Sequence, residues 1–368
     1  MNKTKKIFID FKVFSNLPVE DKKVILFIEK AHDLIYFKRF FNDFYNTFQI
    51  KILVLISDTR DINSIEELPF VNNVVFVGDG IIRIIYFRLL SGKVFFTTTP
   101  DIGNSELQKS NYDMKYFYLF HSLVSSHRIY NQKAFDNFDY ILTAGPHHDK
   151  EIRKNEKVYK LKAKNLLHFG YPRILDLKEE YKNQLTVKHK TIILIAPTWG
   201  KWSITETCIK SLFDNLLKFN YELIFRPHPI TVSQNNRLLL DLKSKYKDKV
   251  EFQYNINTTK FLKKVDILIS DWSGFALEFH LISKKNIIFI DTPAKVKNNE
   301  YEKLDIIPIE EQIRKKIGFI LPINNIFKIN SLIKNILNKK NIVKEITGLV
   351  YDYEKNKKEV FKSIKKYL

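Results

Sequence analysis

Short apolar runs rich in β-branched residues alternate with longer amphipathic segments along most of this chain. The runs lie at 24–28, 50–56, 73–77, 93–97, 116–120 and 140–143, and then at 191–196, 222–225, 250–254, 266–269 and 286–290. Helical periodicity marks intervening segments such as 203–219, 232–246 and 274–282. Because strands that alternate with helices form βα units, the pattern predicts an α/β protein with parallel sheets.

The length of 368 residues is more than one ordinary domain needs. The strand pattern weakens between residues 176 and 190, so we expect one Rossmann-like domain over 1–180 and a second over 181–323. Residues 324–368 contain eleven Lys and four acidic residues and no further predicted strand. We expect this Lys-rich C-terminus to be helical and to pack across the junction or on a surface.

The composition excludes several kinds of site. A single cysteine, Cys208, excludes an internal disulfide framework and a cysteine-rich zinc site. The chain has no Gly-x-Gly-x-x-Gly, no Walker loop, no Gly-x-Ser-x-Gly and no Asp-x-Asp metal clamp, so we expect neither a metal nor a bound cofactor. No signal peptide is visible, and no apolar stretch approaches the ~20 residues of a membrane-spanning helix. We therefore expect a cytoplasmic location.

The chain carries 61 basic and 41 acidic residues, a net charge of +20. Three explanations are a Lys-, Ile- and Asn-rich composition, attraction to an anionic membrane or a phosphorylated substrate, and nucleic-acid binding. No helix-turn-helix, zinc-finger or RNP-like pattern accompanies the charge, so nucleic acid is not an expected partner. Charge alone does not separate the first two explanations.

Polar segments follow three strands of the second half, and parallel sheets bind ligands beyond the C-terminal ends of their strands. The first segment places Thr198 and Lys201 in a turn after Ala196. A cleft-lining loop and an ordinary strand-to-helix turn capped by Thr198 both explain this pattern.

The second polar segment is Phe225-Arg226-Pro227-His228-Pro229. Its prolines fix the backbone on both sides of His228 and so set the direction of the imidazole. The planar guanidinium of Arg226 suits phosphate oxygens. A donor-phosphate site and a structural corner with a solvent-facing His are the two interpretations.

The third polar segment contains Ser270, Asp271, Ser273 and Gly274, and Glu278 follows about one helical turn later. Free N–H groups at a helix start, together with serine hydroxyls and a flexible glycine, form a seat for a phosphate. Glu278 would reach ribose hydroxyls, as acidic residues do in dinucleotide sites. Alternatively, Ser273 or Asp271 only caps the helix.

In this order, the three segments resemble the donor-binding half of the CDP-glycerol glycerophosphotransferase family, the teichoic-acid polymerases and primases. That family shows Ala-Pro-Thr-Trp, Arg-Pro-His-Pro-like and Ser/Thr-Asp-Tyr-Ser-Ser segments. Its Gly-Tyr-Pro-Arg stretch between the domains resembles Gly170-Tyr171-Pro172-Arg173. The similarity covers residues 167–291.

The chain departs from the family pattern at Gly200, where the family often has Arg, at Trp272 in place of Tyr, and at Gly274 in place of Ser. The resemblance implies a GT-B-type fold and a nucleotide-activated donor such as CDP-glycerol. Because no Asp-x-Asp metal clamp is present, we expect Arg226, His228 and a helix dipole to stabilise the donor phosphates without a metal.

The N-terminal half lacks the family's His-Gly signature and instead has His121 and His127 after a predicted strand. Because His titrates near neutral pH, His121 would act as the general base for an acceptor hydroxyl. His127 is the second candidate, and it would otherwise contact phosphate or acceptor. The alternative is a core His with a local hydrogen bond. Arg173 and Lys201 are secondary candidates for the site.

These features predict a transferase that moves glycerol phosphate, or a related polyol phosphate, to a hydroxyl of a lipid-linked or growing surface polymer. The apolar segment 81–90 and the Lys-rich C-terminus would rest on the inner face of an anionic membrane; a buried helix whose arginines reach the surface is the alternative. Three other functions stay open: a GT-B glycosyltransferase that uses a nucleotide-sugar for capsule or lipooligosaccharide synthesis, a nucleotide-sugar epimerase, and a non-catalytic glycan-binding subunit.

Overall fold

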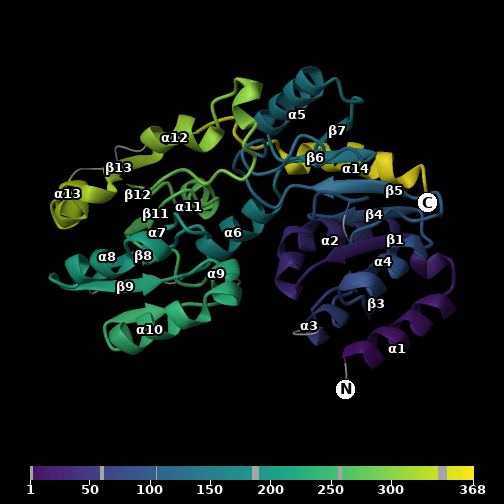
Figure 1. Cartoon of the computed structure of the whole chain (residues 1–368), viewed down its shortest axis with the longest axis horizontal. Helices are drawn as coiled ribbons and strands as arrows, with labels where there is room; N and C mark the ends of the chain where they lie inside the picture. The colour runs from purple at the N-terminus through teal and green to yellow at the C-terminus, as the bar shows by residue number, and fades with distance from the viewer. Residues whose placement is uncertain (1–2, 59–61, 105, 185–189, 256–258, 339–345) are drawn as a thin grey trace. The chain divides into compact units, whose positions relative to one another are not determined.

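The computed structural model describes residues 3–58, 62–104, 106–184, 190–255, 259–338 and 346–368 (Figure 1). The chain forms two compact units, each built on one parallel sheet. The first unit contains Met1–His121, Tyr130–Arg173 and Gly348–Leu368, and the second contains Ser122–Ile129 and Ile174–Thr347. These two parallel-sheet units confirm the predicted fold class.

The first unit has a seven-stranded sheet in the order β3-β2-β1-β4-β5-β6-β7. Its strands are β1 (Val24–Ile28), β2 (Ile52–Ile56), β3 (Val71–Phe76), β4 (Val94–Thr97), β5 (Lys115–Leu119), β6 (Tyr140–Thr143) and β7 (Asn165–His168). Its α-helices are α1 (Lys3–Asn16), α2 (Lys38–Phe48), α3 (Asn63–Glu66), α4 (Gly80–Arg88), α5 (Pro146–Tyr159) and α14 (Tyr353–Lys365).

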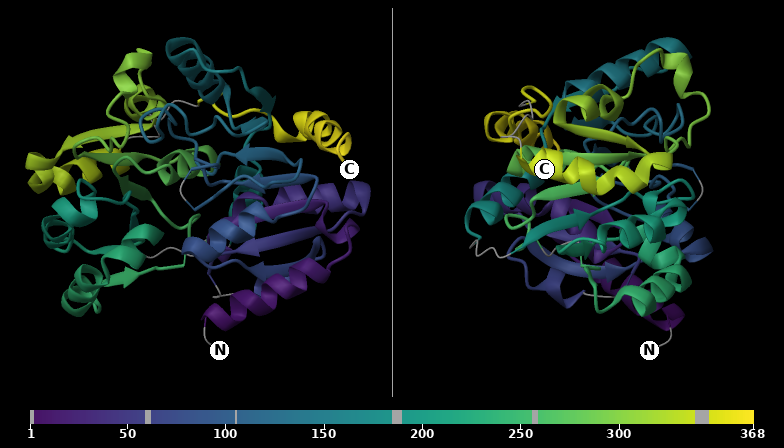
Figure 2. Two further views of the ribbon diagram at one scale, coloured as in Figure 1. Left: turned by 45° about the vertical axis from the view of Figure 1, so that its right-hand side comes forward. Right: turned by 90° about the vertical axis from the view of Figure 1, so that its left-hand side faces the viewer.

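Aromatic side chains fill much of the core of the first unit. Strands β1 and β2 are buried throughout, as their unbroken apolar sequences predict for parallel strands covered on both faces. Phe361 of α14, the yellow helix in Figure 2, packs against Phe40, Phe44 and Phe48 of α2. The end of the chain therefore completes the core of the first unit.

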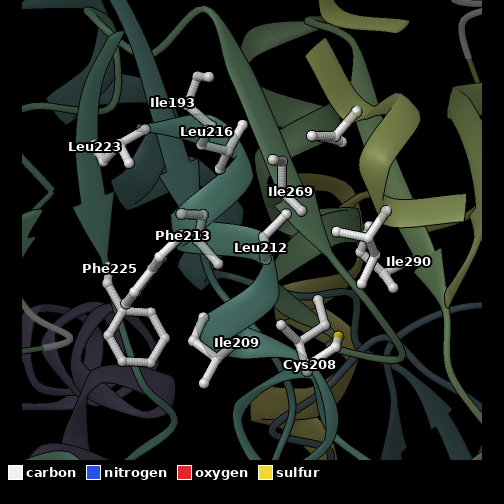
Figure 3. Close-up of a cluster of buried hydrophobic side chains, with 14 of the residues drawn as sticks. Ile193, Cys208, Ile209, Leu212, Phe213, Leu216, Leu223, Phe225, Ile269 and Ile290 are labelled. Carbon is white, nitrogen blue, oxygen red and sulfur yellow. The ribbon is translucent and has the colours of Figure 1, made fainter. Parts of the chain in front are cut away.

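The second unit has a six-stranded sheet in the order β10-β9-β8-β11-β12-β13. Its strands are β8 (Thr191–Ile195), β9 (Tyr221–Phe225), β10 (Val250–Phe252), β11 (Ile267–Ser270), β12 (Ile287–Asp291) and β13 (Gly318–Pro322). Its α-helices are α6 (Arg173–Lys182), α7 (Ile204–Thr207), α8 (Ile209–Leu216), α9 (Pro229–Gln234), α10 (Asn236–Tyr246), α11 (Phe275–Ser283), α12 (Ile309–Ile317) and α13 (Ile329–Asn338). Figure 3 shows part of the core, where Phe213 of α8 packs edge-on against Phe225 of β9.

The predicted strands appear within two residues of their expected bounds. The structure adds β7 and β13, which were not among the predicted strands; β7 has a single buried residue, and in β13 the apolar run is only three residues long, between Gly318 and Pro322. The helices expected over 203–219 and 232–246 are each two shorter helices. They break at Cys208 and Asn235, where the backbone is not helical.

The structure divides the chain differently from the expected domains 1–180, 181–323 and 324–368. The boundary lies at Arg173, where α6 begins, and part of the expected junction, 185–189, lies outside the described residues. The C-terminal residues do not form a unit of their own, because α13 belongs to the second unit and α14 to the first.

Helix α4 matches the buried-helix alternative for segment 81–90 only in part: Tyr86 and Phe87 are buried and Arg88 is exposed, but other residues of the segment differ. Ile81 and Ile85 are 75% and 53% exposed, and Leu89 is also exposed. Arg83 instead points inward and pairs with Glu29 and Glu106. No helix within the described residues has the length and hydropathy needed to cross a membrane.

Candidate functional site

The predicted donor residues lie at the topological switch point of the second sheet. Strand β8 pairs with β9 on one side and with β11 on the other, so the strand order reverses between β8 and β11. Ligands bind at such a point in open α/β sheets. Because all strands of this sheet are parallel, the loops after β8, β9, β11 and β12 leave the same edge.

Asp271 and Ser270 join the loop after β11 to the loop after β8. The buried Asp271 carboxylate, 1% exposed, accepts the backbone N–H groups of Thr198 and Ile204 at 2.6 and 2.9 Å. Ser270 Oγ donates to the carbonyl of Ala196 at 2.7 Å. Burial raises the pKa of Asp271, and these N–H bonds oppose the shift. The contacts give both residues a supporting role, and their direct contact with a donor stays a prediction.

His228 faces the same loop from β9. Its Nδ1 accepts the backbone N–H of Ile230 at 3.1 Å and so caps α9. In the neutral imidazole the proton is therefore on Nε2, which can donate to a phosphate oxygen. The rings of His228 and Trp199 are 6.2 Å apart. The segments after β8 and β9 therefore meet, as the sequence predicts.

Arg226 lies beside the start of α11. Its guanidinium is 4.9 Å from the ring of Phe261 and 5.1 Å from that of Phe275, the first residue of α11. Arg226 is buried, and Ser273 and Gly274 directly precede Phe275. The cation and the helix start predicted to hold phosphate are thus close together.

The helix start itself is closely packed. A Cβ at Gly274 would lie 2.5 Å from Ser122 Oγ, so a larger residue here would require the Ser122 side chain to move. The N-cap of α11 is Gly274, with no side-chain cap, and the Asp271 carboxylate bonds elsewhere. Asp271 therefore does not cap α11, and the capping role of Ser273 stays an alternative. Glu278 is buried in the first turn of α11, and its contact with a ribose stays a prediction.

Two predicted residues belong to the first unit. His121 follows β5, and its carbonyl accepts the Tyr171 hydroxyl at 3.1 Å. The His121 ring is 5.7 Å from that of Tyr36, over which the Arg173 guanidinium also lies at 5.7 Å. His121 and Arg173 thus share one aromatic cluster. The general-base role of His121 stays a prediction.

His127 belongs to the second unit, although it lies in the N-terminal half of the sequence. It is buried, and its Nε2 lies 3.2 Å from the carbonyl oxygen of Ile306. Asn298 Nδ2 donates to the His127 carbonyl at 2.9 Å. These contacts match the alternative of a core His with a local hydrogen bond. Lys201, another secondary candidate, lies over the exposed ring of Trp202 at 5.1 Å.

Two cations that follow β12 were not predicted from the sequence. Lys295 Nζ and Lys297 Nζ lie 3.7 and 4.0 Å from the ring centroid of Trp199. Burial lowers the pKa of Lys295 to about 7, and the charge of Lys297 adds to this effect. Their position after a predicted strand, in Thr-Pro-Ala-Lys-Val-Lys, was the available signal.

Trp272 packs against two further cations that the sequence did not predict. Arg314 and Arg128 lie 4.0 and 5.5 Å from its ring, and its Nε1 donates to the carbonyl of Thr292 at 2.9 Å. Arg128 also pairs with a carboxylate of Glu311. This packing connects residues 122–129 to the loop after β12.

Two further observations concern metal binding and the location of the site. In the part of the chain that the structure describes, no three His, Cys, Asp or Glu side chains gather where they could hold a metal. A cavity of about 680 Å³ lies at the opposite edge of the sheet, near Lys190, Tyr221 and Val250, where β8, β9 and β10 begin. We place the site at the switch point, because the residues with phosphate-binding chemistry converge there and not at this cavity.

Comparisons with known proteins agree with this geometry. The sequence model of the CDP-glycerol:poly(glycerophosphate) glycerophosphotransferase family matches residues 112–303, just over half of the chain and including all three polar segments. None of the curated protein sequences matches.

Solved structures are similar over nearly the whole chain. A His-to-Asn variant of the wall teichoic acid polymerase TagF, soaked with CDPG, has a TM-score of 0.58 at 15% identity, covering 99% of this chain and 93% of that chain. The Methanocaldococcus jannaschii UDP-GlcNAc 2-epimerase in complex with UDP-GlcNAc and UDP has a TM-score of 0.60 at 13% identity, covering 94% and 100%. The UDP-GlcNAc-bound 2-epimerase of Neisseria meningitidis has a TM-score of 0.54 at 11% identity, covering 94% and 100%.

At these identities the solved structures establish the fold, which is of the GT-B type. The family match rests on the sequence and includes the segments of Thr198, His228 and Asp271. The chain belongs to the CDP-glycerol:poly(glycerophosphate) glycerophosphotransferase family.

Proposed function

We propose that this chain transfers glycerol phosphate from CDP-glycerol to a hydroxyl group of a growing surface polymer. The observation that carries the proposal is the convergence of the segments of Thr198, Arg226 and His228 at the switch point, within the region that matches the family. The TagF structure soaked with CDPG supports a CDP-activated donor.

The donor residues would stabilise the charge that develops as the nucleotide leaves. The acceptor oxygen attacks the phosphorus that bears glycerol, and the bond from that phosphorus to the oxygen bridging to CMP breaks. Arg226, His228 Nε2 and the first N–H groups of α11 would hold the diphosphate oxygens, since cations and helix N-termini stabilise such charge. Thr198 and Ser273 would add hydroxyl donors, and Glu278 would bind the ribose.

The proton of the acceptor hydroxyl would pass to His121, the general base in this proposal. The positive groups named above supply the charge stabilisation, so transfer is proposed to be independent of a metal. Unchanged turnover after treatment with EDTA would support this part of the proposal.

The acceptor is proposed to be lipid-linked, with the protein bound peripherally at the inner face of the membrane. Helices α1 and α4 pack together through Phe11 and Tyr86, whose rings are 5.1 Å apart. Phe8 of α1 and Ile81 of α4 are exposed, as is the neighbouring Lys12. An apolar surface with lysines suits an anionic membrane interface.

CMP release from CDP-glycerol, with and without a polyglycerophosphate acceptor, tests the proposal directly. Acceptor-dependent release and a lengthened polymer are expected. Acceptor-free turnover of a UDP-sugar would instead indicate an epimerase, and transfer from a nucleotide-sugar would indicate a glycosyltransferase. If calorimetry detected no nucleotide binding, the result would favour a non-catalytic glycan-binding subunit.

A further inference from the structure

We propose that Lys295 and Lys297, which lie on the indole of Trp199, bind phosphoryl oxygens of the nucleotide-activated donor. The inference rests on the proposed function, because it adds two cations to the same donor site. Neither lysine belongs to the segments that resemble the family.

The position of the two lysines follows from the sheet. They come directly after β12, whose C-terminal end lies at the same edge as those of β8 and β9. Their Nζ atoms lie 3.7 and 4.0 Å from the Trp199 centroid. Because both distances end on one ring, the two nitrogens are within about 8 Å of each other, where like charges repel. One diphosphate is large enough to contact both.

The charges of these lysines are not neutralised by the protein. Among the described residues neither ammonium group has an ion-pair partner, whereas Arg128 and Arg314 pair with Glu311 and Asp291. An aromatic ring attracts a cation without cancelling its charge. Trp199 therefore holds both ammonium groups in place and leaves their charge for an anion.

The electrostatics of Lys295 agree with an anion-binding role. Burial and the charge of Lys297 lower the pKa of Lys295 to about 7, and only the more weakly coupled Asp271 opposes them. His228 is a neighbour of the same indole, with its ring centroid 6.2 Å from that of Trp199. A bound diphosphate would favour the charged form of Lys295, so binding should take up a proton near neutral pH.

Calorimetry with inorganic pyrophosphate, CDP and cytidine tests the inference. The variant Lys295→Met/Lys297→Met keeps two unbranched apolar side chains and removes both charges. We expect it to weaken pyrophosphate and CDP binding by about tenfold or more while cytidine binding is unchanged. Lys334→Met is the matched control, because Lys334 lies 4.6 Å from the ring of Phe219, on a helix outside the site. It should bind all three ligands like the wild type.

Titrations in two buffers of different ionisation enthalpy provide a second measurement. Proton uptake on CDP binding at pH 7.5 is expected for the wild type and not for Lys295→Met. A merely structural role for Lys295 would not produce this difference. Lys295→Arg/Lys297→Arg should restore pyrophosphate binding, and thermal melts check that each variant is folded.

The outcomes separate this inference from the proposed function. Equal pyrophosphate affinity in the wild type and the double Met variant would overturn the role of the lysines, while CDP-glycerol turnover would still support the transferase. If the wild type bound pyrophosphate through the lysines but did not bind CDP-glycerol, the phosphate-binding role of the lysines would stand. CDP-glycerol would then be refuted as the donor. A wild type that binds neither ligand would refute both.

Discussion

The backbone N–H of Thr198 donates to the buried carboxylate of Asp271 at 2.6 Å, and this bond connects the two strands between which the sheet order reverses. A second bond, from the N–H of Ile204, occupies the other carboxylate oxygen. Asp271, in the family-like segment Ser-Asp-Trp-Ser, thus fixes the conformation of the loop that contains Thr198 and Trp199. Burial raises the pKa of Asp271, and these bonds, the backbone N–H of Trp272 and the charge of Arg314 favour its charged form.

Asp271→Ala should lower the free energy of unfolding by about 2–4 kcal/mol, because it leaves two buried N–H groups without acceptors. Urea denaturation measures this loss. Ser270→Ala, which removes one bond to the Ala196 carbonyl, should cost about 1 kcal/mol. If Asp271→Ala were as stable as the wild type and lost only donor binding, direct contact with the donor would be the better account.

Replacements of His228 should separate its two ring nitrogens. Asn can replace Nδ1 as the cap of α9, so His228→Asn should keep the stability of the wild type, whereas His228→Ala should lose about 1 kcal/mol. Both variants lack Nε2 and should lose CMP release. His228→Gln, whose amide N–H can approach the position of Nε2, should retain part of the activity. Full turnover of His228→Asn would remove His228 from the donor site.

Gly274→Ala should destabilise the protein by about 1–3 kcal/mol, because the added methyl group would collide with Ser122 Oγ. The backbone at Gly274 is helical, with φ −61°, so the cost is steric and not conformational. Ser122→Gly should therefore rescue Gly274→Ala in a double-mutant cycle measured by urea denaturation. Additive effects of the two substitutions would show that the two residues do not meet.

The stability of the wild type relative to Lys295→Met should depend on pH. The folded state releases the Lys295 proton near pH 7, whereas the unfolded chain keeps it to about pH 10.4. The stability contributed by this residue should therefore rise with pH above about 7, because there the unfolded state binds more protons. Donor affinity should fall over the same range. Parallel denaturation series at pH 6 and pH 9 measure the first effect, and a pH-independent difference would contradict the lowered pKa.

Substitution of the exposed apolar residues of α4 should weaken membrane binding. Ile81→Ser/Ile85→Ser should reduce co-sedimentation with vesicles containing anionic lipid, without changing the melting temperature, since both side chains are already exposed. Phe327→Ser is a control, because Phe327 is equally exposed but belongs to the second unit. Equal binding of all three proteins would exclude α4 as the membrane contact.

Much of the fold followed from the apolar runs, because strands buried on both faces have unbroken hydrophobic sequences. Strand β7 was not predicted, because this edge strand has only one buried residue and its sequence, Asn-Leu-Leu-His, is not an unbroken hydrophobic run. The convergence of the three polar segments was predictable because neighbouring parallel strands end at the same edge of a sheet. Lys295 was missed because its significance depends on Trp199, almost a hundred residues away, and the sequence does not reveal that contact.

The division of the chain into units could not be predicted for the same reason. In the sequence, residues 122–129 belong to the N-terminal half. In the structure, His127 forms a hydrogen bond with the carbonyl of Ile306 and Arg128 forms an ion pair with Glu311. Such pairings connect residues about 180 positions apart. Periodicity within a segment carries no information about them.

The packing of Phe361 on Phe40, Phe44 and Phe48 has a consequence for synthesis on the ribosome. Domains usually fold as they emerge, the N-terminal one first. Here the first unit, whose translation begins earliest, waits for α14, which is made after the entire sheet of the second unit. A nascent chain truncated before α14 would lack the contacts of Phe361 with these three rings of α2, so such truncations should be prone to aggregate.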